Sequence, residues 1–159
     1  MIVLFNRIYC SLRKKELEVA MAKFKKMKVD AILQRLTKLC WKNNIQYKVL
    51  IKTKNTLIIE LIGSYEDVLF KYHKTDMVSK EQLDFFMNSI DEKKAHKGVY
   101  ITTGIFERKD NRTFSRKKIK RDIILEDCFS FTKNHLGIKG NAKKNFQIDR
   151  LNLFKYLPQ

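Results

Sequence analysis

The chain is poor in the residues that break or cross-link a polypeptide: its 159 residues include one proline, five glycines and three cysteines. So little proline and glycine excludes collagen and proline-rich low-complexity proteins. Cys10, Cys40 and Cys128 are odd in number, far apart and without a C-x-x-C pair, which supports neither a disulfide framework nor a zinc ribbon. We therefore expect a reducing, intracellular compartment.

Long hydrophobic runs are missing as well. Charged or polar residues interrupt every apolar stretch before it reaches the roughly 18 to 20 residues that a membrane span needs. Hydrophobic residues nevertheless make up 44% of the chain, which is enough for the core of one domain. We expect a soluble protein without a membrane partner.

Acidic residues are scarce relative to basic ones. The chain has 34 Lys and Arg against 17 Asp and Glu, so its formal net charge is 34 − 17 = +17. Such an excess opposes compaction unless a polyanion neutralises it. Nucleic acid, DNA or RNA, is therefore the first partner to consider, and an anionic membrane surface the second.

The first fifteen residues carry four basic side chains and no acidic one, among several apolar residues. This composition is typical of a mitochondrial targeting peptide, although the first helix of a domain would look similar. We divide the chain into a basic N-terminal segment (1–28) that includes this candidate targeting region, a domain (29–137) and a basic C-terminal tail (138–159). The sequence carries no signal for oligomeric state, and a dimer remains open.

The periodicity of apolar residues predicts alternating helices and strands. A spacing of three to four residues predicts helices over 13–27, 30–44, 79–94 and 129–136, with Asp30 and Ser79 as N-caps. Alternation or β-branched composition predicts strands over 47–53, 56–62, 67–72, 98–103 and 123–125. This order predicts an α/β fold with a mixed sheet covered by helices, in which 98–103 is a central strand.

One stretch differs in kind from the rest. Residues 108–121 contain eight basic side chains and one acidic one, a net charge of 8 − 1 = +7 in fourteen residues. Such a run is often only a solvated surface, but this one lies between two predicted core strands. A basic loop at a sheet edge would contact phosphates and position a duplex without reading its sequence.

Three stretches suggest a family: 68–74 (VLFKYHK), 97–106 (KGVYITTGIF) and 123–127 (IILED). In this order, after a helix that ends in two asparagines, they resemble the Mrr-like branch of the restriction-endonuclease fold. The resemblance covers about residues 30–136 and implies an α-β-β-β-α-β core, a restriction-endonuclease-like mixed sheet flanked by helices. For active members it implies metal-dependent hydrolysis of DNA phosphodiesters by a D…(E/Q)-x-K constellation.

The chain matches that constellation in part. Lys71 stands at the place of the motif lysine, and Glu60, on the preceding strand, stands where the family has aspartate. Leu69 occupies the (E/Q) position, and leucine cannot coordinate a metal. Asp67 is four residues from Lys71, about 13 Å along a strand at roughly 3.3 Å per residue. The resemblance implies Glu60 and Lys71 as catalytic residues and Glu60, Asp30 and Asp67 as ligands of Mg²⁺ or Mn²⁺.

We therefore expect a nucleic-acid-binding protein, in first place a metal-dependent DNA endonuclease. Two alternatives stay open: a derivative of this fold that binds DNA without cleaving it, because of Leu69, and a basic RNA-binding or ribosome-associated protein. The side chains expected to contact phosphates are His73, Lys74, Arg108, Arg112, Arg116, Lys117, Lys118, Lys120 and Arg121.

A surface that stacks nucleic-acid bases combines aromatic side chains with basic ones that contact the phosphates. The remaining aromatic residues do not form such an interleaved pattern along the chain. We therefore assign Trp41, Tyr47, Tyr65 and Tyr72 to packing.

Neutralising Lys117, Lys118 and Lys120 together should weaken binding to all DNA duplexes alike, because phosphate contacts carry no sequence information. Binding by the unmodified chain should fall steeply as salt is added. Fluorescence anisotropy with several labelled duplexes measures both effects. Unchanged affinity of the triple variant would exclude this loop as the contact surface.

Overall fold

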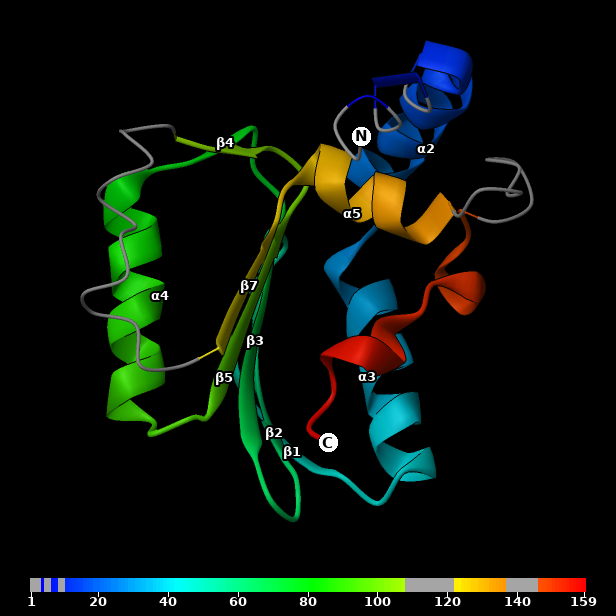
Figure 1. Ribbon diagram of the computed structural model, residues 1–159. Helices are drawn as coiled ribbons and strands as arrows, with labels where there is room; N and C mark the ends of the chain where they lie inside the picture. The colour runs from blue at the N-terminus through cyan, green and yellow to red at the C-terminus, as the bar shows by residue number, and fades with distance from the viewer. Residues whose placement is uncertain (1–3, 5–6, 9–10, 108–121, 137–145) are drawn as a thin grey trace.

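The computed structural model describes residues 4, 7–8, 11–107, 122–136 and 146–159. These residues form a sheet with helices on both faces (Figure 1). The helices are α2 (Lys14–Lys26), α3 (Val29–Lys42), α4 (Lys80–Glu92) and α5 (Cys128–Leu136). The strands of the main sheet are β1 (Gln46–Lys52), β2 (Thr56–Ile62), β3 (Asp67–His73), β5 (Lys97–Thr102) and β7 (Asp122–Glu126).

The main sheet is mixed, with the strand order β1-β2-β3-β5-β7. The first three strands form an antiparallel meander, and β3, β5 and β7 run parallel to one another. The predicted α/β class and the mixed sheet covered by helices are thus confirmed. The central position of β5 between β3 and β7 also confirms the prediction made from its nearly uncharged composition.

Two short strands were not predicted. β4 (Met77–Val78) and β6 (Ile105–Phe106) pair in parallel as a separate small sheet. They follow the carboxyl ends of β3 and β5 in the chain. Strands of two residues are too short to show a period of two, so sequence patterns do not reveal them.

The helix starts differ in how well they were predicted. Ser79 caps α4 as expected: its hydroxyl accepts the backbone N–H of Gln82 at 3.2 Å, and the Gln82 side chain accepts that of Ser79 at 3.0 Å. The prediction for α3 was wrong by two residues, because Lys28 is the N-cap and Asp30 lies in the first turn. There its carboxylate faces the positive end of the helix dipole and forms an ion pair with Lys52 at 2.5 Å.

The two faces of the sheet carry separate cores. The face covered by α3, together with α2 and α5, holds the larger one and is called the α3 face (Figure 1). The other, called the α4 face, packs Ile58, Leu69 and Tyr100 against Phe86 and other residues of α4. Gly98 permits this packing, because a Cβ at that position would lie 2.2 Å from the Cδ1 atom of Ile90 on α4.

The segments on either side of residues 29–137 join the α3-face core. On α2, Leu17 and Phe24 are buried, and the Phe24 ring stacks on Phe131 of α5 with centroids 4.4 Å apart. The C-terminal segment forms the 3₁₀ turns η1 (Ile148–Arg150) and η2 (Leu153–Tyr156), and it buries Leu151, Leu153 and Leu157. Phe154 in the same segment is exposed.

A buried carboxylate fastens the C-terminal segment. Glu126, at the end of β7, accepts a hydrogen bond from the Asn134 side chain at 3.0 Å and one from the Tyr156 hydroxyl. The Lys155 ammonium lies 3.7 Å from the same carboxylate. Burial and the bond to Glu126 raise the pKa of Tyr156, so the phenol stays protonated and keeps donating. Glu126 therefore links β7, α5 and η2.

None of the helices within the described ranges is both long enough and apolar enough to cross a membrane.

Replacing Tyr156 by Phe should lower the free energy of unfolding by about 1.5–3 kcal/mol, because Glu126 loses a buried donor to its charged carboxylate. Urea unfolding followed by circular dichroism at neutral pH measures this loss. Tyr65→Phe is the matched control, since Tyr65 is 89% exposed and should change stability by less than about 0.5 kcal/mol. Equal stability of both variants would show that Glu126 does not need this partner.

Candidate functional site

Lys71 occupies an unusual place for a lysine. In the register of the sheet it lies between Ile58 of β2 and Tyr100 of β5, and all three side chains project on the α4 face. The side chain is only 6% exposed. Strand pairing on both sides thus places a cationic side chain in the middle of the sheet, beside an apolar core.

Among the described residues, no carboxylate compensates this charge. Within the described ranges Lys71 forms no ion pair and no hydrogen bond, and its Nζ atom lies 4.6 Å from the centroid of the Tyr100 ring. An aromatic face attracts a cation, by about 2 kcal/mol or more where water is excluded. Burial still disfavours the charged form and lowers the pKa of Lys71 to about 8.

His73 and Tyr100 extend this group toward the carboxyl end of β3. The His73 Nδ1 atom and the Tyr100 hydroxyl are 2.8 Å apart and share a hydrogen bond. Burial lowers the pKa of His73, and the charge of Lys71 lowers it further, so the imidazole is neutral at pH 7. Burial raises the pKa of Tyr100, which keeps its phenol protonated. Lys71 is therefore the single cation of this trio.

Glu60 shares the α4 face with Lys71, as predicted from the sequence. It lies opposite Leu69 on the adjacent strand and is therefore a diagonal neighbour of Lys71, a relation that separates Cα atoms by roughly 7–8 Å. The other diagonal of the same four residues is formed by Ile58 and Leu69, both buried. Glu60 is half-buried, and the two charged side chains form no ion pair.

The other predicted ligands do not join Glu60. Asp67 lies at the opposite end of β3 from His73, where its backbone N–H donates to the His96 ring at 3.0 Å. Asp30 lies on α3, which covers the other face of the sheet, and pairs with Lys52.

Within the described ranges there is no cluster of three or more His, Cys, Asp or Glu side chains. Mg²⁺ requires about six oxygen ligands in octahedral geometry, and Leu69 supplies none. The donor set around Glu60 therefore does not fit the metal that the family resemblance implies.

Of the predicted phosphate contacts, His73 and Lys74 are described. Lys74 is partly exposed and follows β3 directly, with its backbone N–H donating to the Asn55 carbonyl at 2.7 Å. The remaining candidates lie outside the described residues: Arg108, Arg112, Arg116, Lys117, Lys118, Lys120 and Arg121.

Sequence patterns did not reveal the surroundings of several aromatic residues. Tyr100 was assigned only to a buried strand, because its position beside Lys71 depends on a parallel pairing that local patterns do not encode. The assignment of Trp41 and Tyr65 to packing was wrong, since they are 80% and 89% exposed, and Tyr47 is 38% exposed. For Tyr72, which is buried and donates to the Met27 carbonyl at 3.0 Å, the assignment is confirmed.

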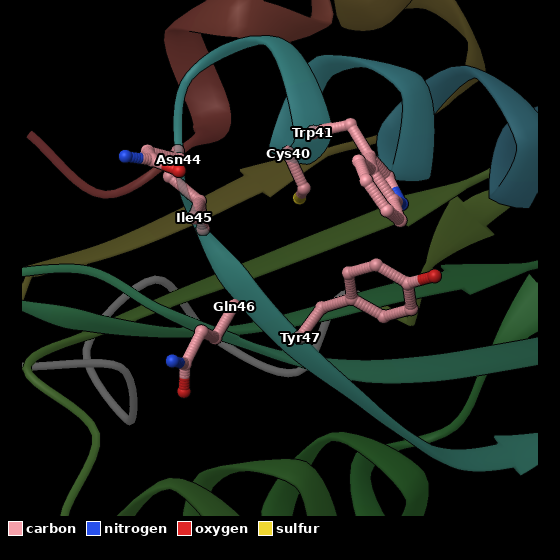
Figure 2. Close-up of a pocket in the computed structure, with 6 residues that line it drawn as sticks. All are labelled: Cys40, Trp41, Asn44, Ile45, Gln46 and Tyr47. Carbon is pink, nitrogen blue, oxygen red and sulfur yellow. The ribbon is translucent and has the colours of Figure 1, made fainter.

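Trp41 and Tyr47 line an open hollow of about 570 Å³ (Figure 2). It lies where α3 ends and β1 begins.

A comparison with family models finds no match for this chain, and a comparison with curated proteins finds none either. The resemblance to the Mrr-like proteins therefore depends on the stretches 68–74, 97–106 and 123–127 alone.

Replacing Lys71 by Met should stabilise the protein by about 1–3 kcal/mol near neutral pH, because burying a charge that prefers water is unfavourable. The stabilisation should shrink as the pH rises from about 8 toward the ordinary lysine value of about 10.4. In that window the folded protein has released the Lys71 proton and the unfolded chain still holds it, so rising pH favours the folded wild type.

Urea unfolding of wild type and variant at several pH values between about 7 and 10 checks this. Lys48→Met is the matched control, an exposed lysine on β1 whose replacement should have a small, pH-independent effect. A stability difference for Lys71→Met that stays constant over this range would contradict a lowered pKa.

Proposed function

We propose that this chain is a nucleic-acid-binding protein of the restriction-endonuclease-like fold that binds duplex DNA and places a backbone phosphate at Lys71. The proposal is supported by the order of its elements, which apart from the two-residue β4 is α3-β1-β2-β3-α4-β5 and corresponds to the α-β-β-β-α-β core of that fold. The observation that carries it is the buried ammonium of Lys71, which has no anionic partner within the described residues.

The physical reason is an imbalance of charge. A buried cation is unfavourable unless an anion compensates it, and natural proteins rarely retain one without a use. A phosphate oxygen would supply the missing partner and restore the ordinary pKa of the lysine. The neutral His73 and Tyr100 beside it use one of their two protons in the hydrogen bond that they share, which leaves one donor for a phosphate oxygen and adds no further charge.

Binding without cleavage is the form of this function that the donor set favours. Hydrolysis of a phosphodiester by this family's chemistry needs a metal held by several oxygen ligands. Leu69, Asp30 and Asp67 do not complete such a set with Glu60, as described above. Long-range attraction by the net charge of +17 would bring DNA to the protein irrespective of sequence.

A metal-dependent endonuclease is the second candidate, because Glu60 and Lys71 do project on the same face of adjacent strands. This arrangement is what the motif requires of its first acidic residue and its lysine.

The wild type should bind a blunt duplex with an affinity that falls as salt increases from about 50 to about 200 mM. Lys71→Met should weaken binding to all duplexes and reduce the slope of log affinity against log salt by about 1, because one phosphate contact is lost. Lys93→Met is the matched control, an exposed lysine directly after α4. Anisotropy titrations at several salt concentrations measure the slopes. Absence of duplex binding by the wild type would refute the proposal.

Supercoiled plasmid separates the two candidates. Retarded but intact plasmid in the presence of Mg²⁺ or Mn²⁺ supports a binding protein. Nicking that disappears in both Lys71→Met and Glu60→Gln would establish the endonuclease instead. A preference for structured RNA over duplex DNA in competition would refute DNA as the partner.

A further inference from the structure

We propose that the hollow lined by Trp41 and Tyr47 binds the unpaired bases of a single-stranded nucleic acid. This inference rests on the proposed function in that it names a second class of nucleic acid for the same protein. The surface is nevertheless separate, because Tyr47 lies opposite Leu61 on the α3 face, whereas Lys71 projects on the α4 face.

A tight turn connects the end of α3, which carries Trp41, to the start of β1, which carries Tyr47. The backbone N–H of Ile45 donates to the carbonyl of Cys40 at 2.9 Å, and the Asn43 side chain donates to that of Leu39 at 2.8 Å. Asn44 adopts a left-handed conformation with a φ of 59°, which ends the helix and redirects the chain into β1. The hollow is thus preformed by backbone hydrogen bonds.

The aromatic surface in this hollow is open to water. Figure 2 shows the Trp41 indole and the Tyr47 ring on the same side, the indole above the phenol, while Gln46 points away from them. The Trp41 side chain is 80% exposed, and neither ring contacts another aromatic ring in the described part of the chain. Two exposed faces of this kind are what stacked bases require.

The charge around the hollow identifies the occupant. Residues 31–59 contain six basic side chains and no acidic one. Lys38 and Lys42 lie next to Trp41 on α3, and both are exposed. Aromatic rings bordered by lysines suit a polyanion whose bases are free to stack. A duplex keeps its bases stacked inside, and an apolar protein surface would leave these lysines without counter-charges.

The chain offers a direct readout, because Trp41 is its only tryptophan. A thymine homopolymer of about 12 nucleotides should quench the fluorescence of Trp41 in the full chain, since stacking brings a base onto the indole. A blunt duplex should leave that fluorescence unchanged while it binds. Tyr47→Ala should weaken binding of the homopolymer about tenfold, and Tyr47→Phe should restore it by keeping the ring.

Tyr65→Ala is the control, an exposed tyrosine in the turn between β2 and β3, outside the hollow, that should leave both affinities unchanged. Thermal unfolding of each variant confirms that it is folded. Duplex binding with no quenching by the homopolymer would overturn this inference and leave the proposed function intact. Quenching that depends on Tyr47 but no duplex binding would support the hollow and refute the proposed function. Absence of both would refute both.

Discussion

The register of β3 between its two neighbours is the constraint on which the α4 face depends. Because β2 pairs antiparallel and β5 pairs parallel to β3, Lys71 must lie between Ile58 and Tyr100, with Glu60 one diagonal step away. A shift by one residue would turn Lys71 to the α3 face and bring Phe70 and Tyr72 out of the core that they now occupy. The larger core therefore fixes the position of the charged residue, and the aromatic ring of Tyr100 makes that position tolerable.

The local elements were predictable because each carries its own signal. Ser79 with Gln82 marks the start of α4, and Gly98 with the β-branched residues after it marks β5. The pairing of strands has no such signal, so the contact of Lys71 with Tyr100 and the small β4–β6 sheet became visible only in three dimensions. The burial of Glu126 had no local signal either, because its buried partner Tyr156 lies thirty residues further along the chain.

In the candidate site, too, local features were predictable from the sequence and long-range contacts were not. Sequence placed Glu60 and Lys71 on one face correctly, because antiparallel strands joined by a short turn leave few alternative registers. It placed Asp30 wrongly beside them, because nothing in a helix reveals which face of a sheet the helix will cover. Trp41 was misassigned for a related reason: burial depends on what lies across from a side chain, and the chain turns away after Asn44.

The outer strand β1 has a wider consequence for how copies of this protein meet. Its Val49 and Ile51 are exposed, and no described strand pairs with its outer backbone edge, an arrangement that favours edge-to-edge aggregation. A bulge between these residues and the lysines at positions 48 and 52 oppose such contacts, as gatekeepers do in natural sheets. Lys52 is already paired with Asp30, so a polyanion that neutralises Lys48 would remove the remaining uncompensated charge of these two lysines and with it part of that protection.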